Sequence, residues 1–249
     1  MIENREGKKV PEVIFKSRSN NQFVDVSTSD IFSGKTVVVS SLPGAYTPTC
    51  SASHLPRFNE LAASFKENGG DDIVCISVND AFVMDAWKKE QEADNVTLIA
   101  DGNGDFTRGM GMLVDKSDLG FGQRSWRYSM LVRDGYIEKQ FIEPEVSGDL
   151  FEVSDADTML NYINPNVKKP LPVSLFTKPG CPYCLAAKSK LEENGLDYEE
   201  IVLGKDATMR SLKAMTAKET VPQIFINGRH IGSGSDFEEW LKQLRVARC

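Results

Sequence analysis

The sequence lacks any long apolar run. No apolar stretch approaches the roughly 20 residues needed to span a bilayer, and the polar N-terminus has no apolar signal core. We therefore expect a cytoplasmic protein without a membrane segment. An excess of positive charge is also absent, since 29 Lys and Arg stand against 36 Asp and Glu, for a net charge of −7. This balance gives no electrostatic support for nucleic-acid binding.

Cysteine and histidine are scarce. Five cysteines are too few, and odd in number, for a disulfide framework in a chain without a signal peptide, so we expect reduced thiols. One Cys-x-x-Cys pair has the spacing of half a zinc site. No second pair follows it, and His230 is the only histidine in that half of the chain. We therefore expect no metal and no bound cofactor.

Apolar periodicity predicts strands that alternate with helices, which indicates the α/β class. In the N-terminal part the expected strands are 36–42, 73–78, 97–100, 126–132 and 136–142. The expected helices there are 48–69, kinked near Pro56, then 81–91, and a helix capped by residues 154–157 that ends at 163. In the C-terminal part the expected strands are 173–177, 198–203, 223–226 and 229–231, and the expected helices are 182–194, 207–215 and 236–244.

A stretch with three prolines and no apolar period separates the two parts. Residues 164–172 are therefore expected to form an extended linker. This predicts an N-terminal domain at 1–163 and a C-terminal domain at 173–249. Both domains share one local pattern. An apolar strand is followed by a turn containing proline and then by a cysteine in the first turn of a helix.

Cys50 is the first candidate reactive cysteine. Thr47 is the expected N-cap and Pro48 the first helical residue, which places Cys50 in the first turn. There the backbone N–H groups and the positive end of the helix dipole favour the nucleophilic thiolate over the thiol. His54 lies four residues further along the same helix face, where it can add positive charge or simply pack.

Pro43, Thr47 and Cys50 form the pattern Pro-x-x-x-Thr-x-x-Cys, which resembles the active-site signature of the peroxiredoxins. The longer run from Pro43 to Pro56 is similar to the peroxiredoxin-5-like subfamily, and the resemblance covers nearly the whole N-terminal domain. It implies that Cys50 attacks the peroxide O–O bond, that Thr47 bonds the peroxide and that Pro43 shields the site from water. It also implies that Arg127 stabilises the thiolate and the departing oxygen, with Arg124 as the alternative if the strand register differs.

The sulfenic acid formed on Cys50 must be resolved by a second thiol. Cys75 lies in an apolar, strand-like run, and free cysteines are commonly buried, so we expect it to be structural. Cys249 ends a polar tail and is expected to be exposed and incidental, or else to form an intermolecular disulfide. The resolving thiol is then expected to come from elsewhere.

The pair Cys181 and Cys184 is the second candidate site. It follows a predicted strand and opens a predicted helix, a context in which Cys-x-x-Cys is typical of a redox motif. Cys181 lies near the helix N-terminus with Lys178 close by, and both features favour its thiolate. Cys184 is one turn deeper, so it is expected to be more buried and less reactive.

The Cys-Pro-Tyr-Cys motif, the Thr-Val-Pro run and a glycine before the last helix resemble a glutaredoxin over essentially the whole second domain. The resemblance implies that Cys181 accepts glutathione from a mixed disulfide and that Cys184 completes an internal disulfide. It implies a cis peptide bond before Pro222. The implied glutathione-binding residues are Lys178, Tyr183, Thr220, Val221, Pro222, Gly232, Ser235 and Asp236. The family usually has Gly-Gly, a polar residue and paired acids before the last helix, so Ser233 and Ser235 are departures, although the helix N-terminus remains for anion binding.

Together the two resemblances imply a fusion of two thioredoxin-like domains, each a central mixed β-sheet flanked by helices. The implied activity is reduction of hydrogen peroxide and small organic hydroperoxides, with glutathione as the reducing co-substrate and glutathione reductase as an indirect partner. Such fusions form homo-oligomers, so we expect a dimer or tetramer with contacts between domains of different subunits.

Two other functions fit the same residues. A redox sensor or chaperone-like scaffold would consume a single equivalent of peroxide, whereas a peroxidase turns over many times. A glutaredoxin that delivers iron–sulfur clusters would be coloured when purified, and it would leave the N-terminal domain idle.

Overall fold

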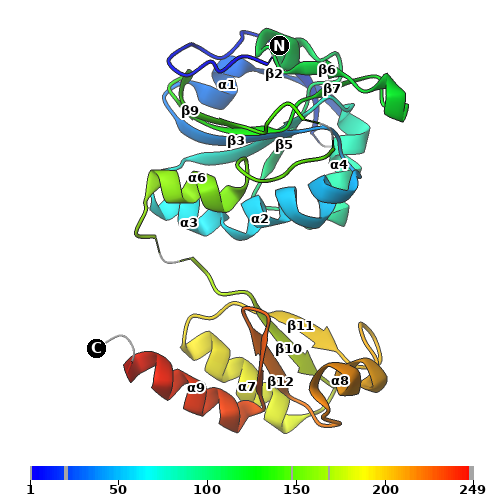
Figure 1. Ribbon diagram of the computed structural model, residues 1–249, viewed down its shortest axis with the longest axis vertical. Coiled ribbons are helices and arrows are strands. Elements are labelled where there is room, and N and C mark those ends of the chain that lie inside the picture. The colour runs from blue at the N-terminus through cyan, green and yellow to red at the C-terminus, as the bar shows by residue number, and fades with distance from the viewer. Residues whose placement is uncertain (1, 20–21, 147, 168, 247–249) are drawn as a thin grey trace. The chain divides into compact units, whose positions relative to one another are not determined.

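The chain divides into two compact units, Met1–Lys168 and Lys169–Cys249 (Figure 1). The computed structural model describes residues 2–19, 22–146, 148–167 and 169–246. Each unit has its own sheet and its own apolar core. Residues 164–167 and 169–172 form neither helix nor strand, and Val167 packs against the core of the first unit.

A five-stranded mixed sheet is the centre of the first unit, in the order β5-β4-β3-β8-β9. Its strands are β3 (Thr36–Leu42), β4 (Asp72–Ser77), β5 (Thr97–Ala100), β8 (Tyr128–Arg133) and β9 (Tyr136–Ile142). The first three run parallel to one another, whereas β8 is antiparallel to β3 and β9 is antiparallel to β8. Nearly every residue of β3 and β4 is buried, as expected for apolar runs in the middle of a covered sheet.

Helices lie on both faces of this sheet. Successive strand residues point to opposite faces, so Val38 and Cys75 pack on one side and Val37 and Val39 on the other. The first side carries α2 (Leu55–Glu60), α3 (Ala62–Glu67), α4 (Ala81–Glu90) and α6 (Ala156–Ile163). The other side is covered by α1 (Thr28–Phe32), α5 (Asp105–Gly109) and β1 (Ile14–Ser19). Figure 1 shows α2, α3 and α6 together on one side of the sheet and α1 on the other.

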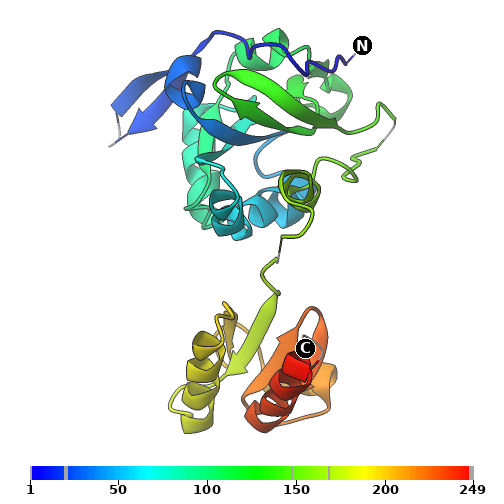
Figure 2. The ribbon, with the colours of Figure 1, turned by 90° about the vertical axis from the view of Figure 1, so that its left-hand side faces the viewer.

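Several short elements were not predicted. They are β1, β2 (Gln22–Ser27), α1, α5, β6 (Leu113–Asp115), the 3-10 turn Ser117–Leu119 and β7 (Gln123–Ser125). β1 and β2 form an antiparallel hairpin that projects from the edge of the first unit (Figure 2). These segments are short and mostly polar, so they carry little periodic signal.

The single helix expected at 48–69 is wrong in detail. A π-helical turn, Cys50–His54, lies between the helix start at Pro48 and α2, and the break between α2 and α3 falls at Leu61 rather than at Pro56. Pro56 follows the π-turn directly. In a regular α-helix its ring would clash with the carbonyl of Ala52, and it has no N–H to donate there, so the wider turn accommodates it.

The second unit has a four-stranded mixed sheet in the order β11-β10-β12-β13. Its strands are β10 (Val173–Thr177), β11 (Glu199–Val202), β12 (Gln223–Ile226) and β13 (Arg229–Gly232), and only the β10–β11 pair is parallel within this sheet. Its helices are α7 (Pro182–Glu193), α8 (Met209–Thr216) and α9 (Gly234–Val246). Leu191 of α7 and Phe237 of α9 pack in one core with Leu175 and Ile224 of the sheet. The predicted α/β class, with mixed sheets flanked by helices, is confirmed in both units.

Among the described residues, no helix combines the length and apolar character that a membrane crossing requires.

Candidate active site

Cys50 lies in the turn of helix that follows β3, and its side chain is fully buried. The loop between strand and helix is fixed by Asn79, whose Oδ1 accepts hydrogen bonds from the Ala45 N–H (3.0 Å) and from the Ser77 hydroxyl (2.8 Å). The Ser51 N–H donates to the Thr47 carbonyl (3.0 Å), which makes Thr47 the N-cap by its backbone. Cys50 is therefore held in the first turn of the helix, as predicted.

Arg127 brings a buried guanidinium to the Cys50 sulfur. It lies between β7 and β8, is 2% exposed, and its Nη1 is 3.4 Å from Cys50 Sγ. The Arg124 guanidinium instead donates to the Val78 carbonyl (2.8 Å). The register therefore places Arg127, and not the alternative Arg124, against the sulfur.

His54 is neutral in this site. Its Nδ1 is 3.0 Å from Arg127 Nη1, and because a guanidinium can only donate hydrogen bonds, Nδ1 must accept and carries no proton. Complete burial, together with the charge of Arg127, lowers the pKa of His54 to about 3. The suggestion that His54 adds positive charge is therefore wrong. It packs between Phe58 and Phe151 and accepts from Arg127.

Thr47 and Pro43 line the loop before the helix, and both are partly buried. The Thr47 hydroxyl donates to the Gly44 carbonyl (2.9 Å). Because its hydrogen is used there, its oxygen lone pairs are left to accept a hydrogen bond from a bound molecule.

Three residues of this site escaped the sequence analysis. Asp149 Oδ1 accepts from Arg127 Nη2 (2.5 Å), and the Thr49 hydroxyl also hydrogen-bonds Asp149. Phe151 places its ring 4.9 Å from the His54 ring and 5.6 Å from the Arg127 guanidinium. Glu143 accepts four hydrogen bonds from the segment that carries both residues. This segment has no regular secondary structure, so no periodic signal marks it.

Cys75 is buried on the interior strand β4, beside Ser40 of β3. Burial raises the pKa of its thiol to about 12, against a smaller opposite effect of a hydrogen bond with Ser40. A thiol that holds its proton this firmly is a poor nucleophile. The structure thus favours the structural role expected for Cys75. Cys249 lies outside the described residues.

Cys181 is the N-cap of α7 in the second unit. Its sulfur accepts a hydrogen bond from the Cys184 N–H (3.2 Å), and it is 6% exposed. Cys184 is more deeply buried, and burial, followed by its hydrogen bond with Cys181, raises the pKa of the Cys184 thiol to about 11. Cys184 therefore keeps its proton at neutral pH, and its thiol makes a hydrogen bond with the Cys181 side chain.

A loop that ends in a cis peptide bond lies against Cys181. The Val221–Pro222 bond is cis, as the resemblance implied, and the Val221 carbonyl is 3.9 Å from Cys181 Sγ. Gln223, which the sequence analysis did not select, is buried behind this loop. Its Nε2 donates to the Thr220 carbonyl (3.0 Å), and its Oε1 is 2.6 Å from Nε2 of His230. Gln223 thereby fixes the backbone that faces the cysteine.

The start of α9 is shaped by Gly232 and Asp236. Gly232 has φ +121°, and a Cβ there would lie 2.4 Å from Asp236 Oδ2. The Asp236 carboxylate accepts from the N–H and the hydroxyl of Ser233 (both 2.7 Å). Hydrogen bonds from Ser233 also lower the pKa of Asp236. The Ser235 hydroxyl makes a hydrogen bond with the Ser233 hydroxyl (2.9 Å). Ser233 and Ser235, the two residues that depart from the family pattern, therefore form one capping group with Asp236.

The remaining predicted glutathione residues are open to solvent. Lys178 and Thr220 are exposed, and Tyr183 is 74% exposed. Lys178 lines a depression of about 200 Å³ together with both cysteines. Of these three exposed residues, Lys178 is the one that shares this depression with Cys181.

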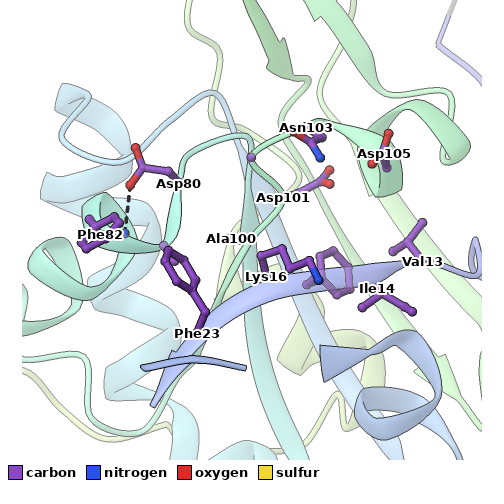
Figure 3. Close-up of a pocket in the computed structure, with 13 residues that line it drawn as sticks. Val13, Ile14, Lys16, Phe23, Asp80, Phe82, Ala100, Asp101, Asn103 and Asp105 are labelled. Carbon is purple, nitrogen blue, oxygen red and sulfur yellow. Dashed lines mark hydrogen bonds between the residues drawn. The ribbon is translucent and has the colours of Figure 1, made fainter. Parts of the chain in front are cut away.

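Another depression, of about 200 Å³, lies between the β1–β2 hairpin, the start of α4 and the end of β5 (Figure 3). None of the predicted site residues lines it. Its acidic groups are already used within the fold, since Asp80 caps α4 through Phe82 and Val83, and Asp101 accepts from the N–H groups at the start of α5. The described residues contain no group of three or more His, Cys, Asp and Glu placed to hold a metal ion.

Known proteins resemble this chain along its whole length. Residues 5–160 match the Redoxin family, and residues 173–231 match the Glutaredoxin family. Hybrid peroxiredoxin hyPrx5 of Haemophilus influenzae is 58% identical over 239 residues, which are 96% of this chain and 99% of that protein. Peroxiredoxin-2B of Arabidopsis thaliana is 42% identical over 145 residues, 58% of this chain and 88% of that protein. The crystal structure of reduced Prx3 in complex with H2O2 from Vibrio vulnificus superposes with a TM-score of 0.60 at 38% identity, over 64% of this chain and 98% of that one.

Proposed function

This chain belongs to the hybrid peroxiredoxins, in which a redoxin domain precedes a glutaredoxin domain, and from that premise we propose that it is a glutathione-dependent thiol peroxidase. Redoxin and glutaredoxin domains both have the thioredoxin fold, so the predicted pair of thioredoxin-like domains is confirmed. The observation that carries the proposal is the Arg127 guanidinium 3.4 Å from the buried Cys50 sulfur. The proposed substrates are hydrogen peroxide and small organic hydroperoxides.

The first step is attack of the Cys50 thiolate on one peroxide oxygen. An S–O bond forms, the O–O bond breaks, and the departing oxygen leaves as alcohol or water after it takes up a proton. Negative charge moves from sulfur to that oxygen, and Arg127 is placed to stabilise both ends of the movement. The free lone pairs of Thr47 can accept the peroxide O–H, while Pro43 keeps water from the sulfur.

The second step is reaction of the Cys50 sulfenic acid with glutathione. The glutathione thiolate attacks the sulfur, an S–S bond forms, and the hydroxyl leaves as water. Cys50 is fully buried, so a tripeptide reaches it only if the first helical turn moves. Hydrogen peroxide is small enough to need less opening.

The third step moves glutathione to the second domain. The Cys181 thiolate attacks the glutathione sulfur of the mixed disulfide and releases Cys50 as thiolate. A second glutathione then attacks the glutathione on Cys181 and leaves as oxidised glutathione, which glutathione reductase recycles. Cys184 offers the alternative of an internal disulfide. The proposed glutathione contacts are the exposed side chains of Lys178, Tyr183 and Thr220, the Val221 backbone, Pro222, and the Gly232–Asp236 turn.

We place this cycle in the cytosol, where glutathione is abundant and thiols stay reduced. The proposed assembly is a homo-oligomer, a dimer or a tetramer, in which the glutaredoxin domain of one subunit serves the peroxiredoxin domain of another.

Steady-state consumption of hydrogen peroxide with glutathione and glutathione reductase tests the proposal. We expect near-zero activity for Cys50→Ser, strong loss for Cys181→Ser and partial retention for Cys184→Ser. A Cys50→Ser protein with full activity would overturn the assignment. A wild-type protein that consumes one equivalent of peroxide and stops would indicate a sensor instead.

A further inference from the structure

The segment 149–154 is fastened over the Cys50 site by Glu143. The Glu143 carboxylate accepts from the N–H groups of Glu152, Val153 and Ser154 (2.8 to 3.1 Å) and from the Ser154 hydroxyl (2.7 Å). Burial opposes ionisation of this carboxyl, but these donors outweigh it and lower the pKa of Glu143. The segment therefore has a fixed base beside β9, although it has no regular secondary structure itself.

The other end of the segment, at Asp149 and Phe151, contacts the residues around Cys50. Asp149 accepts from Arg127 Nη2 at 2.5 Å and from the hydroxyl of Thr49, the residue that precedes Cys50. Phe151 packs against the His54 ring and the Arg127 guanidinium. One carboxylate thus joins the guanidinium to the helical turn that carries the sulfur.

We propose that Asp149 is a positioning residue that holds Arg127 against Cys50 and, through Thr49, latches the Cys50 turn shut. This inference rests on the proposed function, because it assigns Asp149 a part in both the peroxide step and the glutathione step. Asp149 does not touch the sulfur. It keeps Nη1 of the same guanidinium aimed at the sulfur by occupying Nη2, and a guanidinium held at two nitrogens has little freedom to rotate.

The two roles act in opposite directions on the two steps. Loss of the Asp149 charge lets Arg127 rotate away, so the peroxide step slows. The same loss removes a tie between the segment and the Cys50 turn. The buried sulfur then becomes accessible more often, and the glutathione step speeds up.

Rapid-mixing fluorescence separates these steps. Trp87 donates from Nε1 to the Ser51 hydroxyl (3.0 Å), next to Cys50, so its emission reports on that turn. In a Trp240→Phe background, which leaves Trp87 and Trp126 of the first unit as the emitting residues, peroxide and then glutathione are mixed with the full-length protein. For Asp149→Asn we expect the peroxide rate constant to fall about tenfold and the glutathione rate constant to rise several-fold, as loss of one charge-assisted hydrogen bond implies. Glu152→Gln removes a charge from an exposed side chain of the same segment and should change neither rate constant.

A second variant keeps the inference testable on its own. Thr49→Val removes the hydrogen bond between Asp149 and the Cys50 turn but leaves the hydrogen bond between Asp149 and Arg127. It should therefore speed the glutathione step. Its peroxide rate constant should fall less than the peroxide rate constant of Asp149→Asn. Slowing of both steps in Asp149→Asn would mean a merely structural role and overturn the inference, as would rates equal to wild type. A wild-type protein without a peroxide-dependent phase would instead defeat the proposed function.

Discussion

Arg127 is the side chain on which the proposed chemistry at Cys50 depends most, because it donates to the sulfur and both side chains are buried. Replacement by methionine keeps much of the volume and removes the donors. We expect Arg127→Met to lower the rate constant for peroxide reduction by about 100-fold, since loss of one buried donor to a reacting charge commonly costs that much. Alkylation of Cys50 by iodoacetamide at pH 7 should slow as well.

Arg124→Met is the matched control for that prediction. Its guanidinium donates to the Val78 carbonyl and not to the sulfur, so its peroxide rate constant should stay near that of the wild type. Equal losses in both variants would contradict the role of Arg127.

His54 makes the stability of the first unit depend on pH. Burial, followed by the charge of Arg127, lowers its pKa to about 3 in the folded protein. The unfolded chain takes up a proton on this residue below about pH 6.5, whereas the folded chain does not until about pH 3. The free energy of unfolding should therefore fall as the pH drops, by about 1.6 kcal/mol between pH 6.5 and 5 from this group.

Urea unfolding of the Trp240→Phe protein, followed by the emission of Trp87 and Trp126, measures this dependence. His54→Asn offers Arg127 an acceptor without a titrating ring, so it should remove most of the loss between pH 6.5 and 5. His230→Asn, in the other unit, should leave it unchanged. If the free energy of unfolding of His54→Asn falls as steeply between pH 6.5 and 5 as that of the wild type, His54 is not the group responsible.

Sequence patterns located the residues that carry reactive groups but not the residues that hold them. Cys50 and Cys181 follow strands and open helices, and this local pattern is visible in the chain itself. Asp149 reaches Arg127 across 22 positions of sequence from a segment without periodicity. Gln223 faces the loop before Pro222 only because β12 turns its side chain back towards Thr220. Such contacts depend on tertiary packing, which local patterns do not encode.

The turn from β13 into α9 depends on a glycine at position 232. Its φ of +121° is unfavourable for other residues, and a Cβ would displace the Asp236 carboxylate that caps the helix start. We expect Gly232→Ala to destabilise the second unit by roughly 1–3 kcal/mol. Trp240, which stacks on Phe237 in α9, gives the fluorescence signal for urea unfolding.

Gly234→Ala is the matched control for this turn. No atom lies within 4 Å of a Cβ built there, and its φ is not positive, so alanine should be neutral or slightly stabilising. A Gly232→Ala protein as stable as Gly234→Ala would show that the carboxylate can move aside at no cost.

Among the elements, the apolar strands were predicted best. β3, β10 and β12 have the predicted bounds because each is a short, largely buried apolar run with a strand on either side. The edge strands β5 and β9 also have the predicted bounds, although each has exposed residues. The hairpin β1–β2 was missed because β2 is mostly exposed and has no apolar run. The helix after Cys50 was predicted as one piece because periodicity does not distinguish a π-turn from an α-turn.

At the scale of the whole molecule, the two units repeat the same chemistry with different surroundings. Cys50 is completely buried beside a guanidinium, whereas Cys181 is slightly exposed, with a backbone N–H and a protonated thiol as partners. The first arrangement suits a small oxidant, and the second suits exchange with a peptide thiol. The sequence predicts that the linker raises the effective concentration of one domain near the other.

Transfer between subunits can be tested by mixing two variants that are each inactive or nearly so. Cys50→Ser lacks the peroxide site, and Cys181→Ser lacks the exchange site. If the glutaredoxin domain of one subunit serves its partner, a dimer with one chain of each kind has one working pair. Random exchange of dimers at equal concentrations then restores about a quarter of wild-type activity, since half the dimers are mixed and half their sites work. Each variant mixed with the double variant Cys50→Ser/Cys181→Ser gives the baseline, because that chain contributes neither site. Activity that stays at this baseline after exchange would show that Cys181 serves the Cys50 of its own chain.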